Sequence, residues 1–395
     1  MDRIVVTGIG VISAIGNTVA ENRAALIAGK CGMSRLEMFQ SKFSGFLPVA
    51  EIKISTEELK NKLDAHESGL TRTTLLALHA LKEALADSGL TNEQISAYDT
   101  ALIGANTVGG MCLTDEMHED SKKDTPGSQY IASYDYGSIN MYLQQRYNLN
   151  GTVNTINTAC SSSANAIMYG ARLIKSGRAN RVIVGGVDSL AKFTINGFNA
   201  LHILSPGICT PFDEGRKGLN LGEGAAFLIL EKEADAAGKK IYASLSGYSN
   251  ANDAYHASSL SDEGTGPYKV MKDALALAKL DPSQIDFINA HGTGTENNDL
   301  VEGTAMLRLF GKAPAFASTK ANIGHTLGAA GAIEAVYCIL NLSEQELYPA
   351  VNFKEPIKAI GLEPVKTYQK KVLNHIMSNS FGFGGNCSSL IFSKA

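Results

Sequence analysis

An internal repeat constrains the fold of this sequence more than any other feature. Residues 82–95 recur without a gap as residues 272–285, and in both copies a helix, a polar turn and a strand are predicted in that order. We therefore predict two similar halves, residues 1–238 and 239–395, that pack face to face with a cleft at their junction. The residues that recur are, in the first copy, Lys82, Ala84, Leu85, Ala86, Leu90, Gln94 and Ile95.

Each half is predicted to alternate helices with short apolar strands, which is typical of an α/β layered fold. Residues 72–88 carry leucines at helical spacing and form a clear amphipathic helix. Residues 3–7, 101–105 and 182–187 are short apolar runs that we predict to be strands, and we expect the first of them to end at Gly8.

The charge and cysteine content exclude several classes of protein. The 35 basic and 39 acidic residues leave a net charge of −4, which gives no general attraction to nucleic acid or to anionic membranes. No apolar run approaches the roughly 18 residues of a membrane span, and the N-terminus lacks the basic segment of a signal peptide. The six cysteines form no CxxC pair and have no zinc-site spacing with histidine, so we expect a cytoplasmic protein without a metal.

Cys160 lies in a run of small polar residues just before a predicted helix, residues 164–175. The start of a helix has unpaired backbone N–H groups and a partial positive charge, and both favour the thiolate form of a cysteine. Because the thiolate is the nucleophilic form, Cys160 is a candidate nucleophile. The ordinary alternative is a buried structural thiol.

His291 follows a predicted apolar strand and lies on a glycine-rich turn with Thr293 and Thr295. A histidine at such a place is a frequent site residue, and the two hydroxyl groups can bind a polar chain. A turn histidine bonded to its own backbone is the alternative. Zinc binding with Glu296 and Asp299 is poorly supported, because the spacing matches no known zinc motif.

Two further segments carry candidate site residues. Lys320 and His325 flank a turn between an apolar strand and a helix of small residues, where burial of Lys320 would need an acid, and Glu334 is the best local candidate. The alternative for Lys320 is a solvated surface cation. Residues 378–386 contain two aromatic residues among glycines. This pattern is found in a mobile gate, and the alternative is an ordinary hairpin. One cysteine, two histidines and a lysine together suggest covalent catalysis on an acyl group.

These motifs, in this order, resemble those of the β-ketoacyl-acyl-carrier-protein synthases, the elongating condensing enzymes of the thiolase superfamily. The resemblance implies a five-layered α-β-α-β-α sandwich of two related halves and, normally, a homodimer. It runs nearly end to end and rests on residues 5–10, 158–160, 211–213, 221–224, 291–293, 320–331 and 379–385.

The resemblance also implies roles for the candidate residues. The family's nucleophile falls on Cys160, its catalytic histidines fall on His291 and His325, and its conserved lysine and glutamate fall on Lys320 and Glu334. The implied reaction is decarboxylative Claisen condensation of malonyl carrier protein with the acyl chain on the cysteine.

Binding roles follow in the same way. The gating aromatic falls on Phe383, whose N–H is expected to form the oxyanion hole with that of the nucleophile. Thr293 and Thr295 match the threonines that hold the phosphopantetheine arm, and Asp253 lies in the loop that faces the gate. Val108, just before a Gly-Gly pair, is expected to help close an acyl tunnel.

No metal or diffusible cofactor is implied, because phosphopantetheine arrives on the acyl carrier protein. That carrier is the expected partner, and the chain is expected to form a homodimer or a heterodimer with a related synthase-like subunit. A local basic patch is expected to dock the acidic carrier despite the net charge. Its candidate residues are Lys60, Lys62, Arg72, Lys122 and Lys123.

Two departures from the family pattern leave the substrate open. Residues 296–299 replace the usual Pro-x-Gly-Asp, and residues 386–387 replace the usual Thr-Asn. The serine run at 161–163 is closer to polyketide synthases, so a specialised chain such as an aryl polyene or a pigment is as open as a fatty acid. A degradative thiolase normally has a second cysteine in Cys-x-Gly, whereas Cys387 precedes serines. A non-catalytic chain-length-factor subunit usually lacks the nucleophile that Cys160 supplies.

Overall fold

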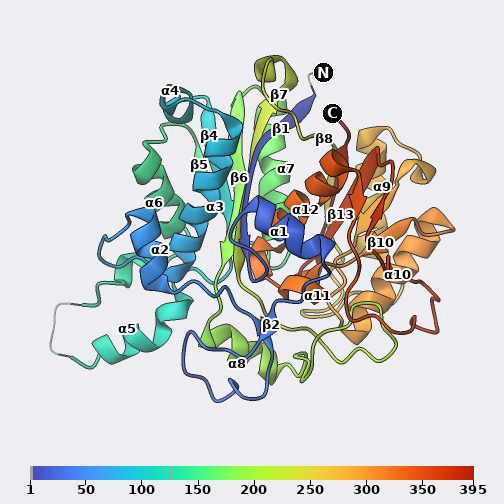
Figure 1. Ribbon diagram of the computed structural model, residues 1–395, viewed down its shortest axis with the longest axis horizontal. Helices are drawn as coiled ribbons and strands as arrows, with labels where there is room; N and C mark the ends of the chain where they lie inside the picture. The colour runs from blue at the N-terminus through green and yellow to red at the C-terminus, as the bar shows by residue number, and fades with distance from the viewer. Residues whose placement is uncertain (1–2, 124–126) are drawn as a thin grey trace.

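The computed structural model describes residues 3–123 and 127–395, and a ten-stranded sheet forms its centre (Figure 1). The strand order is β10-β9-β13-β14-β8-β1-β7-β6-β4-β5. The strands are β1 (Ile4–Ser13), β4 (Thr100–Ala105), β5 (Val153–Ile156), β6 (Arg181–Asp188), β7 (Gly224–Lys232), β8 (Ala243–Asn252), β9 (Phe287–Asn289), β10 (Ala315–Ala317), β13 (His375–Phe381) and β14 (Asn386–Ser393). Two small sheets pair β2 (Met33–Ser34) with β3 (Val49–Ala50) and β11 (Glu346–Leu347) with β12 (Gln369–Lys370).

The two halves of the large sheet repeat one pairing pattern. In β1-β7-β6-β4-β5 the successive pairs are antiparallel, antiparallel, parallel and parallel. The series β8-β14-β13-β9-β10 has the same sequence of directions. The halves join where β1 pairs with β8, at Val5 with Ser244 and Val6 with Ala243. The repeat in the sequence is therefore a repeat of one half-sheet with its helices.

Helices cover both faces of each half-sheet (Figure 1). On the outer faces, α3 packs on β1 and β7 and contacts α6, while α9 packs on β8 and β14 and contacts α10. Between the half-sheets, α7 and α12 pack against each other. The predicted five-layered sandwich of two related halves is confirmed. The helices are α1 (Val19–Ile27), α2 (Thr56–Leu63), α3 (Arg72–Ser88), α4 (Asn92–Ser96), α5 (Thr114–Asp120), α6 (Ser138–Tyr147), α7 (Ser162–Lys175), α8 (Lys192–Ala200), α9 (Thr265–Ala278), α10 (Glu296–Phe310), α11 (Lys320–Ile323) and α12 (Ala330–Glu344).

The central pair of helices approaches closely because its contact is built from small residues. A Cβ on Gly331 of α12 would lie 2.7 Å from the backbone nitrogen of Ala164 in α7. The Ser163 hydroxyl of α7 accepts a hydrogen bond of 2.8 Å from the Ala332 N–H. α12 is buried on all sides, from Ala330 to Leu342, as expected for a helix in a central layer. Neither α12 nor any other helix within residues 3–123 and 127–395 is long and apolar enough to cross a membrane.

The first strand differs from its prediction, whereas the first long helix does not. The helix predicted at residues 72–88 coincides with α3. The strand predicted to end at Gly8 continues to Ser13, because glycine here permits close helix packing instead of a turn. A Cβ at Gly8 would lie 2.5 Å from the carbonyl oxygen of Ala84, and one at Gly10 would lie 2.1 Å from that of Ala80.

The Gly10→Ala substitution is expected to destabilise the protein by about 1–3 kcal/mol or more, because α3 must move away from β1. Gly197→Ala is the matched control. Gly197 lies inside α8 with no atom within 4 Å of its ideal Cβ, so alanine there is expected to be neutral or to stabilise by up to about 1 kcal/mol. Chemical denaturation of both variants measures the difference. Equal stability of the two variants would contradict the packing argument.

Candidate active site

Cys160, His291 and His325 converge at the junction of the two halves, although they are far apart in the sequence. Cys160 precedes α7, His291 follows β9, and His325 lies between α11 and α12. The cysteine sulfur and one ring nitrogen of each histidine lie within 4.8 Å of one another. The two imidazole rings meet edge to face, with 5.4 Å between their centroids. All three side chains are buried at the wall of a cavity of about 550 Å³.

A strained turn presents Cys160 to this cavity. Ala159 has a φ of +54°, in the left-handed region that residues with a Cβ rarely adopt. The turn is held because the Ser162 N–H donates to the Ala159 carbonyl oxygen at 3.1 Å and the Thr158 N–H donates to the Ser162 hydroxyl at 2.8 Å. Helix α7 begins at Ser162, so Cys160 lies just outside its first turn.

The charge state of Cys160 differs from the one that its position before a helix predicts. Burial raises the pKa of the thiol to about 11, and this effect outweighs the Phe383 backbone N–H and the positive charge of Lys320, which favour the thiolate. Transfer of the thiolate anion from water to this buried position costs more free energy than the positive potential of the helix start recovers. Cys160 is therefore a neutral thiol near pH 7.

Lys320 is buried, so the alternative of a solvated surface cation is wrong. Its ammonium group lies 2.5 Å from Glu334 Oε1, and both side chains are 1% exposed. The other two contacts of the ammonium group are to His291, at 2.6 Å from its carbonyl oxygen and 3.3 Å from its Nδ1. Three N–H donors thus meet three acceptors, and the position of the His291 ring is fixed by Lys320.

Both histidines are neutral and have the same tautomer. Burial lowers the pKa of His291 and of His325 well below 6.5, and the charge of Lys320 lowers both further. The Nδ1 atom of His291 faces the Lys320 ammonium group, and the Nδ1 atom of His325 accepts a hydrogen bond of 3.1 Å from the Leu327 N–H. Since Nδ1 is an acceptor in both rings, each ring has its proton on Nε2.

This tautomer also decides whether the three residues fit a metal ion. Their ligand atoms are close enough to be considered for one. A histidine that binds a metal normally donates its other ring N–H to an acceptor, and that acceptor orients the ring. In both histidines here, Nδ1 faces a hydrogen-bond donor, so Nε2 must keep its proton. The surroundings of the two rings therefore do not suit a metal ion.

Two acids of α10 shape the turn that carries His291. The Glu302 carboxylate accepts hydrogen bonds of 2.9 Å from the N–H groups of residues 291 and 292. Asp299 accepts from those of residues 293 and 294, at 2.9 and 3.1 Å. The hydroxyl oxygens of Thr293 and Thr295 lie 2.8 Å apart, and both residues line the cavity. The role of these acids was not predicted from the sequence, although their position directly after the histidine turn was a usable signal.

The aromatic residue of the proposed gate has a partner that the sequence did not indicate. Phe383 stacks on Phe198 of α8, with 5.7 Å between the ring centroids, and both rings line the cavity. The loop of Asp253 does face this segment, since the Asp253 N–H donates to the Gly385 carbonyl oxygen at 2.8 Å. The Asp253 carboxylate, however, lies outside the cavity lining and accepts hydrogen bonds from residues 261 and 266. The Asp253 carboxylate therefore holds its own loop, and its contact with a substrate stays a prediction.

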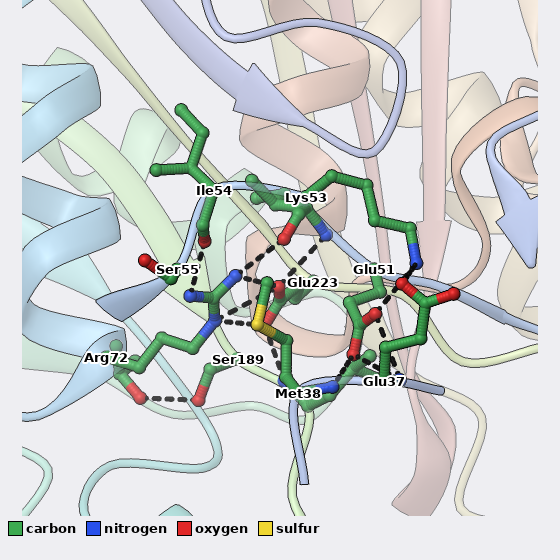
Figure 2. A network of polar contacts seen from close by, with 12 residues as sticks. Glu37, Met38, Glu51, Lys53, Ile54, Ser55, Arg72, Ser189 and Glu223 are labelled. Carbon is green, nitrogen blue, oxygen red and sulfur yellow. Dashed lines mark hydrogen bonds and ion pairs between the residues drawn. The ribbon is translucent and has the colours of Figure 1, made fainter. Parts of the chain in front are cut away.

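Val108 and Arg72 also have surroundings that the sequence did not indicate. Val108 is completely buried in an apolar cluster with Leu190 and Leu327, and it is not one of the residues that line the cavity. Its part in an acyl tunnel stays a prediction. Arg72, a candidate for carrier docking, is directed inward and pairs with Glu223 at 2.6 Å (Figure 2), so it is not part of a docking surface.

The two lysines of the proposed basic patch that follow α5 form ion pairs within their own segment. Lys122 lies 2.7 Å from Glu119, and Lys123 lies 2.8 Å from Asp120. All of these pairs are partly or largely exposed to solvent, where such pairs hold side chains weakly. Residues 114–123 hold four acidic side chains and two lysines, so this segment has a net negative charge and the two lysines do not form an isolated basic patch.

A buried thiol, two neutral histidines and a buried lysine–glutamate pair, at the seam of a duplicated five-layered α/β fold, define an acyl-transferring enzyme of the thiolase type. The family model described as "Beta-ketoacyl synthase, N-terminal domain" matches residues 1–236, and "Beta-ketoacyl synthase, C-terminal domain" matches residues 242–354. The chain belongs to the β-ketoacyl synthase family, as its motifs predicted.

Similar proteins of known name agree with this result. The chain is 34% identical to 3-oxoacyl-[acyl-carrier-protein] synthase 2 of Vibrio cholerae, over 99% of both proteins. Among solved structures it resembles the ishigamide ketosynthase/chain length factor, with a TM-score of 0.93 and 27% identity over 100% of this chain and 99% of that one. It also resembles a type II PKS ketosynthase solved with its acyl-carrier protein, with a TM-score of 0.89 and 28% identity over 100% of both chains.

The rate of alkylation of Cys160 by iodoacetamide is expected to rise about tenfold per pH unit between pH 7 and pH 10. Burial raises the pKa of this thiol to about 11, so the reactive thiolate fraction increases throughout this range. Peptide mass spectrometry measures modification at residue 160 separately from the other cysteines. A rate that levels off below pH 8 would show that the thiolate is stabilised as the sequence first suggested.

Proposed function

We propose that this β-ketoacyl synthase uses Cys160 to hold the growing acyl chain and uses His291 and His325 to stabilise the enolate of the extender unit. The observation that carries the proposal is the tautomer of the histidines, since two Nε2–H donors border the cavity beside the Cys160 sulfur. Donors fixed before the reaction stabilise an oxyanion without further reorganisation.

In the first step Cys160 attacks the thioester of an acyl carrier protein. A bond forms between its sulfur and the acyl carbon, the bond to the phosphopantetheine sulfur breaks, and the thiol proton passes to that departing sulfur. The N–H groups of Cys160 and Phe383 both favour negative charge at this position, so they are suited to an oxyanion hole. The hydroxyls of Thr293 and Thr295 lie where they can hold the pantetheine arm.

In the second step malonyl carrier protein enters and loses carbon dioxide. As the carbon–carboxylate bond breaks, negative charge develops on the thioester oxygen, and the Nε2–H groups of His291 and His325 donate to it. The carbanion then attacks the acyl carbon, the bond to Cys160 breaks, and the sulfur regains a proton from solvent. The Lys320–Glu334 pair keeps His291 neutral and oriented. No metal or diffusible cofactor takes part.

The proposed partner is an acyl carrier protein, in keeping with the names of the similar proteins. The relatives include a 3-oxoacyl-[acyl-carrier-protein] synthase 2 and the similar structures include a type II PKS ketosynthase, so the acyl chain itself is best identified by loading a panel of carriers. We also propose that residues 1–238 form the half with the nucleophile and that residues 239–395 form the half with the histidines. We propose a cytoplasmic location for the protein.

A second subunit is proposed to bind at the β5 edge of the large sheet. β5 is the last strand of the sheet order (Figure 1). Its residues are half-buried or exposed. Met141 of α6 is 58% exposed and Ile131 is 68% exposed, both on the segment that leads to β5. Exposed apolar groups beside an unpaired strand edge favour a protein contact. We propose a homodimer, or a heterodimer with a related synthase-like subunit, at this edge.

The two alternative functions are disfavoured by the surroundings of the cysteines. A thiolase needs a second catalytic cysteine, but Cys387 is fully buried in an apolar cluster with Leu260 and Val270, outside the cavity lining. Burial also raises the pKa of Cys387 far above its usual value. A non-catalytic subunit has no use for Cys160 at a strained turn beside two neutral histidines.

Cys160→Ala is expected to abolish both acyl loading and condensation, since no other cysteine lines the described cavity beside the histidines. Cys387→Ala, the matched control, is expected to load and condense as the wild type does. Intact-mass spectrometry after incubation with acyl carrier protein measures loading directly. If the Cys160 variant still forms β-ketoacyl product, the assignment of the nucleophile is wrong, and if the Cys387 variant is inactive, the thiolase alternative gains support.

His325→Ala is expected to reduce malonyl decarboxylation about 100-fold or more, because one of the two enolate donors is removed. Acyl loading of Cys160 is expected to survive, because loading needs the thiol and the backbone N–H groups. His375→Ala, at the far end of β13, is the control and is expected to retain both reactions. Release of carbon dioxide and intact mass measure the two steps separately. Normal decarboxylation by the His325 variant would refute its role.

A further inference from the structure

Asp188, at the end of β6, is a buried acid that the proposed mechanism does not use. Its side chain is 0% exposed, and no described lysine or arginine forms an ion pair with it. Burial raises the pKa of Asp188 to about 6, although the hydrogen bonds that it accepts lower the pKa, so the acid is ionised above pH 7. A buried carboxylate without a cation is costly, and such a group persists only when many donors surround it.

The donors around Asp188 come from two separate segments. From the loop after β4, the Thr107 N–H donates at 2.9 Å, the Thr107 hydroxyl at 2.6 Å and the Val108 N–H at 2.7 Å. From the turn after His325, the Gly328 N–H donates at 2.7 Å. The carboxylate therefore ties a loop of the first half of the chain to the catalytic turn of the second half.

The turn that Asp188 holds is the one that sets the tautomer of His325. Leu327 has a φ of +52°, a strained value for a residue with a Cβ, and its N–H donates to His325 Nδ1. The next N–H along the chain, that of Gly328, donates to Asp188. A Cβ at Gly328 would lie 2.9 Å from the carboxylate, so the contact is close. Apart from Asp188, no described side chain accepts a hydrogen bond from the Gly328 N–H. Asp188 is therefore the side chain that holds the residue after the strained Leu327 in place.

We propose that Asp188 is a positioning residue for the condensation reaction. By holding the Gly328 N–H it keeps the Leu327 N–H on His325 Nδ1, and so keeps the proton of His325 on Nε2, directed at the enolate. The inference rests on the proposed function of His325. It also links Val108 to this catalytic turn through the same carboxylate.

The two steps of the reaction are expected to respond differently to loss of this acid. Burial is the largest cause of the raised pKa of Cys160, and the negative charge of Asp188 raises it further. Removal of that charge therefore favours the thiolate and does not slow loading. Decarboxylation, which needs the oriented His325, is expected to fall. A merely structural acid would lower both steps together through loss of folded protein.

Asp188→Asn tests the proposal. The asparagine amide has one acceptor oxygen, and its NH2 group would face backbone N–H groups, which are themselves donors. Malonyl decarboxylation is expected to fall about tenfold or more in kcat with little change in KM, while loading of Cys160 is retained. Glu51→Gln is the matched control. Glu51 is also buried and accepts the backbone N–H groups of Glu37 and Met38 (Figure 2), and within the described part of the chain it makes no hydrogen bond to residues 325–328. It is expected to leave both steps unchanged.

A second measurement does not depend on activity. In protein labelled with 15N-histidine, the His325 signals, identified by their loss in His325→Ala, are expected to report a proton on Nε2 in the wild type and a mixture of tautomers in Asp188→Asn. If that variant does not fold, Asp188→Glu, which keeps both oxygens on a longer chain, supplies the same comparison. An unchanged tautomer together with unchanged decarboxylation overturns the inference. A wild-type protein that neither loads nor decarboxylates overturns the proposed function instead.

Discussion

The close packing of α7 on α12 is the constraint on which the rest of the structure depends. These helices come from different halves of the chain, and small residues such as Gly331 and Ala164 let their backbones approach. Their N-terminal ends therefore lie together, with Cys160 before one and His325 before the other. A larger side chain at this contact pushes the two helices apart, because a packed interior transmits such strain. It therefore separates the nucleophile from the histidines without contacting any of these residues.

Burial of the site gives each catalytic group its protonation state. Desolvation keeps the thiol protonated and both imidazoles neutral. Lys320, the cation in contact with His291, is neutralised by Glu334, and its other two donors are directed at the carbonyl oxygen and Nδ1 of His291. The site therefore stabilises negative charge by fixed N–H groups more than by a net positive charge, which is what an enolate that must remain reactive requires.

The sequence was informative where chemistry depends on residue type and order, and less so where it depends on contacts between distant segments. The α3 helix and the α/β class followed from spacing, whereas the family, the five-layered fold and the residues that share the site followed from the family resemblance of the motifs. The sequence shows that a helix start favours the thiolate of Cys160, but it does not show the burial of the folded chain that raises the pKa of this thiol to about 11. The roles of Asp188 and Glu302 were missed for a similar reason, since each accepts backbone N–H groups that any residue type supplies. Arg72 reads as a surface cation until its pairing with Glu223 is seen.

The seam between the halves has the form of a symmetric dimer interface inside one chain. Equivalent elements meet there, since β1 pairs with β8 and α7 packs on α12. Such contacts between like parts are characteristic of a two-fold association of identical subunits. In a dimer of identical chains, every substitution occurs on both sides of the axis at once. Because one continuous chain supplies both sides here, the two equivalent helix starts are free to differ, and one is preceded by the thiol of Cys160 while the other is preceded by the imidazole of His325.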